Sequence, residues 1–486
     1  MRLSDLMQGV EILESSVDWN MDVTGVAYDS RQVQPGNVFV AISGFHADGN
    51  RFIPKALELG AAVVVTDRPA SPDTPCVVVS SARMALAQMG ANWFGHPAEK
   101  MTLVGVTGTN GKTTVTTLLK TVLEQVTGEK VGLIGTIQNM IGQQIVPTER
   151  TTPESFDLQG LLQRMEQAGC RYVLMEVSSH ALALDRVGGI HFQVAAFTNL
   201  TEDHLDFHKT MDAYADTKAA LFRRCDVGVF NLDDPYCSRM MEHASCRSIT
   251  VSGKRPANLT AEALELAADH VAFRLRCANQ TLPVRVGIPG LFTAYNALTV
   301  LGICQALGLS LERAAGALAQ AQGVKGRIEV VPTPGCDFTV LIDYAHTPDG
   351  LENILRAVQG FCKGRVIAVF GCGGDRDAQK RPIMGNIGVT YADYVVFTSD
   401  NPRTEDPDEI LRQILAGVGD SKTPYVVMEN RRAAIRYSLE QARTNDIIVL
   451  AGKGHETYQE IGREKIHLDE REEVANWLAE RGRIHE

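Results

Sequence analysis

The sequence of 486 residues lacks several features that would set it apart from ordinary globular enzymes. It contains no run of 18 apolar residues, so no membrane-spanning helix is expected. The amino-terminal segment carries an early acid, Asp5, and no long apolar stretch, so no signal peptide is expected. The ten cysteines are scattered, without a C-x-x-C pair or framework spacing, which predicts reduced thiols in a cytoplasmic protein.

Positive charge is also scarce. The chain has 47 Lys and Arg against 58 Asp and Glu, a formal net charge of −11, which argues against nucleic acid or an anionic membrane as partner. An anionic substrate must therefore be bound by local donors. No internal repeat or low-complexity tract is present, and the hydrophobic fraction of 44% is that of a globular protein. A chain of this length is longer than a single hydrophobic core usually accommodates, so two or three domains are expected.

A glycine-rich stretch at 104–114 reads Val-Gly-Val-Thr-Gly-Thr-Asn-Gly-Lys-Thr-Thr. It predicts a buried strand, a tight turn and the start of a helix, an arrangement that directs backbone N–H groups at phosphate. Lys112 can reach the terminal phosphoryl groups, and the Thr113 hydroxyl can hold Mg²⁺. The general P-loop pattern is incomplete, since Val106 stands where that pattern has its first glycine. A plain strand-turn-helix joint is the structural alternative.

Polar linkers divide the chain into an expected three-domain α/β protein. Residues 96–100 and 323–327 contain the Pro, Gly and charged residues typical of domain boundaries. We therefore expect a small α/β domain at 1–98, a central P-loop domain with a parallel sheet at 99–326, and a Rossmann-like, doubly wound domain at 327–486.

Two apolar strands of the central domain lead into acidic or histidine residues. The strand at 171–175 is followed by Glu176, and the strand at 194–200 precedes a polar cluster that contains His204. Because ligands bind at the carboxyl ends of parallel strands, Glu176 and His204 are predicted to act beside the glycine-rich loop. Glu202, Asp203 and His208, which belong to the same cluster, are interpreted as solvated or orienting groups.

A predicted helix at 211–222 places Tyr214 and Lys218 on one face. Lysines on helices are usually exposed to solvent. The alternative to a functional role for Lys218 is therefore that it is an ordinary surface residue. Residues 245–290 alternate in the manner of a β-hairpin, and a helical stretch follows.

The C-terminal part alternates strands with helices, and each strand ends in a polar loop. Strands are predicted at 339–343, 366–370, 394–398 and 447–450. The glycines at 371–374 lack the full G-x-G-x-x-G spacing, so a dinucleotide-binding fingerprint is disfavoured.

A series of motifs in one order resembles the Mur ligase family, the ATP-dependent amino-acid-adding enzymes of peptidoglycan precursor synthesis. Within the family, the similarity is to members that add meso-2,6-diaminopimelate to UDP-N-acetylmuramoyl-L-alanyl-D-glutamate. The motifs are Tyr-Asp-Ser-Arg at 28–31, Thr-Gly-Thr-Asn-Gly-Lys-Thr-Thr at 107–114, Thr-Thr-Pro at 151–153, Glu-Val-Ser-Ser-His at 176–180, Asp-His-Leu-Asp-Phe-His at 203–208, Asp-Tyr-Ala-His-Thr-Pro at 343–348, Asp-Asn-Pro-Arg at 400–403 and Gly-Lys-Gly-His-Glu at 452–456.

The resemblance implies that the first domain holds the uridine nucleotide, the second ATP and Mg²⁺, and the third the incoming amino acid. The implied catalytic residues are Lys112, Glu176, His204 and Lys218. The implied ATP contacts are Gly108, Thr109, Asn110, Gly111, Lys112, Thr113, Thr114, Asn296, Arg327, Asp343 and His346. The implied UDP-substrate contacts are Ser30, Thr151, Thr152, Ser178 and Arg186. The implied amino-acid contacts are Arg376, Asp400, Asn401, Arg403, Gly452 and Glu456. The implied metal ligands are Thr113, Glu176, His204 and a carbamylated Lys218.

The implied reaction moves the ATP γ-phosphoryl group to the D-glutamate side-chain carboxylate, and an amine then displaces phosphate from the acyl phosphate. Diaminopimelate carries a distal carboxylate that lysine lacks, and the Arg403 guanidinium is suited to grip it. We also expect a cytoplasmic monomer without a nucleic-acid or membrane partner, in line with the net charge and the lack of a signal peptide or membrane span. The alternatives are a lysine-adding relative, a ligase similar to folylpolyglutamate synthetase, and a non-catalytic ATP switch.

Overall fold

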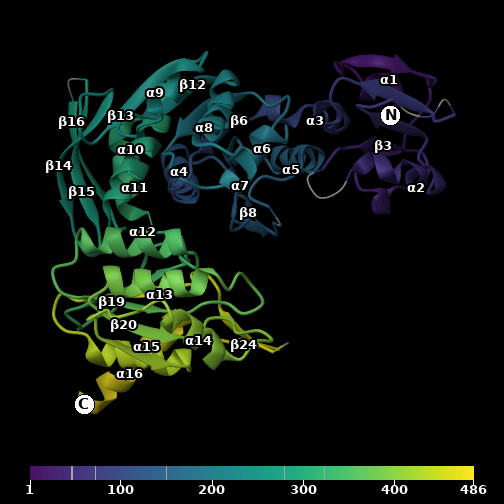
Figure 1. The fold of residues 1–486 in the computed structure, drawn as a ribbon. Coiled ribbons are helices and arrows are strands. Elements are labelled where there is room, and N and C mark those ends of the chain that lie inside the picture. Colours follow the sequence, from purple (N-terminus) through teal and green to yellow (C-terminus); the bar gives the residue numbers. More distant parts are fainter. Residues whose placement is uncertain are drawn as a thin grey trace. The chain divides into compact units, whose positions relative to one another are not determined.

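The structure is a computed structural model that describes residues 1–44, 48–69, 71, 73–148, 150–278, 280–321, 323–462 and 464–485 (Figure 1). The chain forms two compact units. The first contains residues 1–258 and 299–314, and the second contains residues 259–298 and 315–486. No helix in the described part of the chain has both the length and the apolar character needed to cross a membrane.

A mixed sheet forms the amino-terminal part of the first unit, in the order β1-β5-β4-β3-β2. Its strands are β1 Ile12–Ser15, β2 Gly25–Ala27, β3 Asn37–Ala41, β4 Val63–Thr66 and β5 Cys76–Val79. The accompanying helices are α1 Leu3–Leu6, η1 Ser30–Gln32, η2 Gly49–Phe52, α2 Ile53–Glu58, α3 Ala82–Phe94 and η3 Pro97–Lys100. Valine-rich β3, β4 and β5 are buried on both faces, with α1 and α3 on one side and α2 on the other. The small α/β fold predicted for this segment is confirmed.

A largely parallel sheet carries the glycine-rich loop in the same unit. Strand β6 lies between β10 and β11, and β7, β12 and β13 continue the parallel arrangement outward. Its strands are β6 Thr102–Thr107, β7 Val131–Ile134, β10 Tyr172–Glu176, β11 Phe192–Phe197, β12 Cys225–Asn231 and β13 Arg247–Ser252, with the antiparallel pair β8 Asn139–Ile141 and β9 Gln144–Val146 beside β7. The parallel sheet predicted for the central segment is confirmed.

The helices of this region follow the strands. They are α4 Lys112–Thr127, α5 Ser155–Gln167, α6 Ser179–Ala183, α7 Leu205–His208, α8 Met211–Ala219, η4 Ala220–Arg223 and α9 Cys237–Glu242. Helix α4 begins at the loop after β6 and ends at Gly128, whose φ of 74° allows it to cap the helix. The loop is therefore built as predicted, between a buried strand and the amino-terminal end of a helix.

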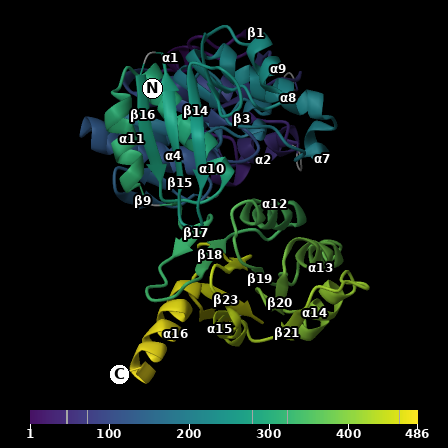
Figure 2. The ribbon, with the colours of Figure 1, turned by 90° about the vertical axis from the view of Figure 1, so that its left-hand side faces the viewer.

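The second unit begins with an antiparallel meander of β14 Leu259–Leu266, β15 Val271–Cys277 and β16 Gln280–Val286. These strands lie side by side in Figure 2. Helices α10 Leu291–Ala306 and α11 Leu311–Gln320 follow them in the chain. The hairpin predicted within 245–290 corresponds to β15 and β16.

The C-terminal sheet has the order β17-β18-β22-β19-β20-β21 and is parallel except for β17. The strands are β17 Glu329–Val331, β18 Thr339–Asp343, β19 Val366–Phe370, β20 Tyr394–Thr398, β21 Tyr425–Met428 and β22 Ile447–Ala451, and a separate antiparallel hairpin contains β23 Tyr458–Ile461 and β24 Glu464–His467. The helices are α12 Pro348–Gln359, α13 Lys380–Tyr391, α14 Pro407–Leu415, α15 Arg431–Gln441 and α16 Glu470–His485.

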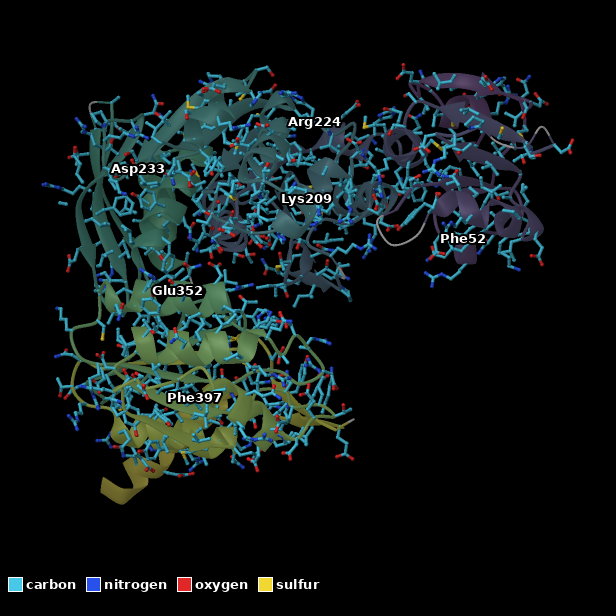
Figure 3. The ribbon with its side chains drawn as sticks, viewed as in Figure 1. Phe52, Lys209, Arg224, Asp233, Glu352 and Phe397 are labelled. Carbon is cyan, nitrogen blue, oxygen red and sulfur yellow. The ribbon has the colours of Figure 1, made fainter. Side chains whose placement is uncertain are left out.

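Alternate residues of these strands face opposite layers of helices. Phe370 and Phe397, the latter labelled in Figure 3, pack toward α12, α13 and α14, while Val369 and Val396 pack toward α15 and α16. Figure 1 shows α12 and α13 on one side of the sheet and α15 and α16 on the other. The doubly wound fold predicted here is confirmed, whereas the β23–β24 hairpin has no counterpart in the predicted elements.

Candidate functional site

The glycine-rich loop has two glycines with positive φ, 148° at Gly108 and 86° at Gly111. A Cβ atom at Gly108 would lie 2.0 Å from Thr198 Oγ1, so a larger residue does not fit there. The end of β11 holds the loop, because Thr198 Oγ1 donates to Asn110 O at 2.7 Å and Asn110 N donates to Asn199 Oδ1 at 2.9 Å. The predicted ATP-contacting residues that lie together in this turn are Gly108, Thr109, Asn110, Gly111, Lys112, Thr113 and Thr114.

Two lysine side chains converge on the carbonyl oxygen of Gly108. Lys112 Nζ donates to it at 2.9 Å and to Thr109 O at 2.8 Å, and Lys218 Nζ donates to it at 2.9 Å. Lys218 is 1% exposed and its Nζ lies 4.6 Å from the centre of the Tyr214 ring, so the predicted shared face is confirmed and the exposed alternative is wrong. Burial, together with the charge of Lys112, lowers the pKa of Lys218 well below its usual value.

Glu176 ends β10 with a carboxylate that is hydrogen-bonded on both oxygens. Thr113 Oγ1 donates to its Oε2 at 2.9 Å, and Thr136 donates to Oε1 through its backbone N at 2.9 Å and to Oε2 through its hydroxyl at 3.0 Å. Thr136 Oγ1 also lies 3.1 Å from Thr151 Oγ1. The structure therefore brings together two predicted metal ligands, Thr113 and Glu176, and links them to a predicted substrate contact.

The donors in this group suit Mg²⁺. Hydroxyl and carboxylate oxygens are hard ligands, and Mg²⁺ commonly takes one or two from the protein and the rest from phosphate and water. Across the described residues, no three His, Cys, Asp or Glu side chains form a ready metal-binding group. Thr113 and Glu176 could therefore supply part of a coordination sphere for a metal that is also bound by nucleotide.

His204 directly precedes α7 as its N-cap residue, with a φ of 54° and a side chain that is 45% exposed. Its ring lies 4.9 Å from that of His180 and 6.2 Å from that of Tyr214, which in turn contacts Lys218. His208 Nε2 lies 2.9 Å from Ser179 Oγ, which agrees with its interpretation as an orienting group. His204 and Lys218 thus both lie next to the Tyr214 ring.

The predicted muramoyl-dipeptide contacts gather beside Glu176. Thr152 Oγ1 donates to Glu176 O at 2.8 Å and lies 3.5 Å from Ser178 Oγ, and Arg186 Nη1 donates to Thr152 O at 3.2 Å. Ser30 lies in η1 and is buried, and no hydrogen bond within the described ranges joins it to this group. Four of the five predicted UDP-substrate contacts are therefore neighbours, and Ser30 lies separately in the amino-terminal sheet region.

In the second unit, a cluster around Tyr344 contains most of the remaining predicted ATP contacts. The Arg327 guanidinium lies 5.3 Å from the Tyr344 ring centre, and the His346 ring lies 4.6 Å from it. Asp343 is buried at the end of β18, and burial raises the pKa of its carboxyl. Asn296 is buried on α10, and no hydrogen bond of the described chain links it to this cluster.

The predicted amino-acid contacts surround a fully buried lysine. Lys453 Nζ donates to Asn401 Oδ1 at 2.9 Å and to Glu456 Oε2 at 3.0 Å, and lies 3.5 Å from Asp400 Oδ1. Gly452 has a φ of 110°, and a Cβ there would lie 2.7 Å from Asp400 Oδ2. Asp400, Asn401, Gly452 and Glu456 therefore form one polar group at the carboxyl ends of β20 and β22.

Arg403 and Arg376 flank Gly373, next to this group. A Cβ at Gly373 would lie 3.1 Å from Arg403 Nη1 and 3.9 Å from Arg376 Cγ. Arg403 has a φ of 50°, which is uncommon for a residue other than glycine and is often found at functional sites. Its Nε donates to Glu460 Oε2 at 2.8 Å and its Nη1 to Gly374 O at 2.8 Å.

Several residues of these groups were not identified from the sequence. Thr198 and Asn199 follow an apolar strand as Glu176 does, so the same pattern could have identified them. Lys453 lies inside a quoted motif, but its burial depends on contacts that local sequence does not report. Thr136 and Glu460 carry no local signal. The residues concerned are Thr136, Thr198, Asn199, Lys453 and Glu460.

Comparison with known proteins covers almost the whole chain. Family models match residues 22–100 (Mur ligase family, catalytic domain), 106–304 (Mur ligase middle domain) and 326–454 (Mur ligase, glutamate ligase domain). The UDP-N-acetylmuramoyl-L-alanyl-D-glutamate–2,6-diaminopimelate ligase of Caldanaerobacter subterraneus subsp. tengcongensis is 49% identical over 483 residues, which cover 99% of this chain and 99% of the relative.

Solved structures agree with these matches. A structure of a UDP-N-acetylmuramoyl-L-alanyl-D-glutamate–2,6-diaminopimelate ligase superposes with a TM-score of 0.76 at 30% identity, over 99% of each chain. Folylpolyglutamate synthase of Mycobacterium tuberculosis superposes with a TM-score of 0.60 at 18% identity, over 76% of this chain and 92% of that one, which shows a shared fold alone.

Proposed function

Since the chain belongs to the Mur ligase family, whose members are ATP-dependent carbon–nitrogen ligases, we propose that it joins meso-2,6-diaminopimelate to the D-glutamate side-chain carboxylate of UDP-N-acetylmuramoyl-L-alanyl-D-glutamate. The product is a precursor of peptidoglycan. The observation that carries this proposal is the 49% identity, over 99% of both chains, to a relative named for that activity.

The first step transfers the γ-phosphoryl group of ATP to the D-glutamate carboxylate, which gives an acyl phosphate and ADP. Two polyanions meet in this step, so it needs fixed positive charge and N–H donors. The loop at 108–114 supplies the N–H groups, and Lys112, held on the carbonyls of this loop, supplies the charge. Mg²⁺, held by Thr113 and Glu176, would supply further neutralisation between the phosphate oxygens.

Lys218 is assigned as a site of carbamylation. Its amine adds to CO₂ and releases a proton, which converts a buried cation into an anionic carbamate. The depressed pKa of Lys218 favours the neutral amine that this addition requires, and the charge of Lys112 favours the anionic product. With Glu176 and His204, the carbamate oxygens would hold a second Mg²⁺.

The UDP-linked dipeptide is assigned to the first unit. Thr151, Thr152, Ser178 and Arg186 would bind its peptide, where the hydroxyls and the guanidinium lie next to the Glu176 strand end. Ser30 would contact the uridine diphosphate part. Arg186 is the cation of this group, and it would meet a carboxylate of the dipeptide.

The second step is attack of the diaminopimelate amine on the acyl phosphate, with release of inorganic phosphate. Acidic side chains suit the ammonium groups of this substrate and guanidinium groups suit its carboxylates. The assigned amino-acid contacts are Arg376, Asp400, Asn401, Arg403, Gly452 and Glu456, and the ATP contacts of the second unit are Asn296, Arg327, Asp343 and His346.

We expect a cytoplasmic monomer without nucleic-acid or membrane partners, in keeping with the net charge of −11.

Phosphate release from ATP tests the proposed function. The purified protein is assayed with UDP-N-acetylmuramoyl-L-alanyl-D-glutamate and with diaminopimelate, lysine or no amino acid. We expect release that requires the UDP substrate and is strongly favoured by diaminopimelate. Equal rates with lysine would assign a lysine-adding enzyme, and release that ignores the UDP substrate would favour a ligase similar to folylpolyglutamate synthetase.

A further inference from the structure

We propose that Glu460 is a specificity-determining positioning residue, which orients the Arg403 guanidinium toward the distal carboxylate of the diamino acid. This inference rests on the proposed function and deepens it. Glu460 lies on β23, in the hairpin whose second strand is labelled β24 in Figure 1. The residue would not itself touch the substrate.

The β23 strand runs along the Asp400–Arg403 loop and bonds to it at successive positions. Gln459 Nε2 donates to Asp400 O at 2.7 Å, and Glu460 N donates to Asn401 Oδ1 at 2.9 Å. Arg403 N donates to Glu460 O at 3.0 Å, and Gly462 N donates to Arg403 O at 2.7 Å. These bonds hold Arg403 at its positive φ, so the hairpin fixes the backbone position from which the arginine side chain extends.

The side chain of Arg403 is then held at two of its three nitrogens. Its Nε donates to Glu460 Oε2 at 2.8 Å, and its Nη1 donates to Gly374 O at 2.8 Å. Nη2 has no hydrogen-bond partner among the described residues. A carboxylate binds a guanidinium with two parallel bonds, and both N–H groups of Nη2 and the second N–H of Nη1 remain for such a pair. Glu460 binds Nε and so leaves these donors to the ligand.

Lys465 fixes Glu460 in turn. Lys465 Nζ lies 3.3 Å from Glu460 Oε1 and 4.2 Å from the centre of the Tyr458 ring, so the carboxylate has a cation on each side. Lys465 on β24 faces Glu460 across the hairpin. The carboxylate therefore orients Arg403 while Lys465 offsets much of its negative charge, which would otherwise weaken the attraction of the guanidinium for an anion.

This arrangement favours diaminopimelate over lysine through preorganisation. A free arginine side chain loses considerable rotamer entropy on binding, and a guanidinium already held in position loses less. Only a substrate with a distal carboxylate gains from this, since lysine offers no group to Arg403. Loss of Glu460 should therefore weaken diaminopimelate binding and leave the other substrates unaffected.

The test measures steady-state kinetics of the full-length enzyme with Glu460→Ala, Glu460→Gln and a matched control, Glu464→Ala. Glu464 lies on β24, is exposed, and has no side-chain hydrogen bond or ion pair within the described residues. We expect Glu460→Ala to raise the KM for diaminopimelate about tenfold, the scale of a charge-assisted hydrogen bond, with the KM values for ATP and the UDP substrate unchanged. Glu460→Gln keeps an acceptor oxygen and should restore most of the affinity. Glu464→Ala should behave as wild type.

A double-mutant cycle with Arg403→Ala separates orientation from general support of the loop. If Glu460 acts through Arg403, Glu460→Ala has no further effect on the KM for diaminopimelate in the Arg403→Ala background. Additive effects, an equal rise in all three KM values, or a Glu460→Ala enzyme identical to Glu464→Ala would each overturn the inference. A wild-type enzyme that does not use diaminopimelate would instead overturn the proposed function.

Discussion

At the scale of single residues, Lys218 is the clearest case of chemistry set by surroundings. It is 1% exposed, and burial beside Lys112 lowers its pKa, which favours the neutral amine that the proposed carbamylation requires. We predict that enzyme equilibrated with ¹³C-bicarbonate shows a carbamate carbon signal by NMR, which is lost in Lys218→Ala together with about a hundredfold or more of kcat. The exposed Lys254 provides the control, since Lys254→Ala should keep both. A signal that survives in Lys218→Ala would contradict the assignment.

At the scale of elements, the turn between β6 and α4 depends on the absence of a side chain at Gly108. We predict that Gly108→Ala abolishes binding of a non-hydrolysable ATP analogue in calorimetry, because the new Cβ would lie 2.0 Å from Thr198 Oγ1 and would displace the loop. Gly128, at the other end of α4, has a φ of 74° and no atom within 4 Å of an added Cβ. Gly128→Ala should therefore lower stability by about 1 kcal/mol and leave nucleotide affinity intact. Equal loss of nucleotide binding in both variants would refute a specific role for the turn.

At the scale of the whole molecule, two compact units predict that unfolding is not a single two-state transition. Arg431 and Glu470 are both buried in the second unit, where the guanidinium donates to Glu470 Oε1 at 2.7 Å and to the carbonyls of Ser399 and Ala451. We predict that Arg431→Met destabilises that unit by about 3–5 kcal/mol, because Glu470 is left unpaired. In a urea titration, the unfolding midpoint of the second unit should fall, and the unfolding midpoint of the first unit should not change. Arg431→Met combined with Glu470→Gln should lose less stability, and a common shift of both transitions would rule out independent units.

Features of the fold and of the candidate site could be predicted from the sequence where they depend on residues that are close together in the chain. The strands at 339–343, 366–370 and 394–398 have the predicted bounds, because buried parallel strands are apolar runs that end abruptly at polar loops. The position of Glu176 beside the glycine-rich loop also followed from local pattern, because Glu176 closes such a strand, and the structure places it 2.9 Å from Thr113 Oγ1. In contrast, the β23–β24 hairpin is polar and half exposed, so its sequence carries no clear strand signal.

Contacts between distant segments were beyond local pattern. Lys453 was assigned no role because nothing near it in the sequence indicates that it is buried among Asn401 and Glu456. Glu460 contacts Arg403 across a separation of 57 residues. Such pairs form only when the sheet has brought the loops after β20 and β22 together. The local sequence around each residue does not indicate that these loops become neighbours.

The order of strands in the C-terminal sheet has a consequence for biosynthesis. Strand β22 lies between β18 and β19, yet it is the last strand of that sheet to leave the ribosome. A nascent chain that has reached β21 therefore lacks the central strand, and its two neighbours cannot pair across the gap. The Asp400–Arg403 loop is completed later still, because the β23–β24 hairpin that is hydrogen-bonded to it follows β22 in the chain. The Asp400–Arg403 loop can thus take its final form only after most of the chain, including the glycine-rich loop at 108–114, has emerged.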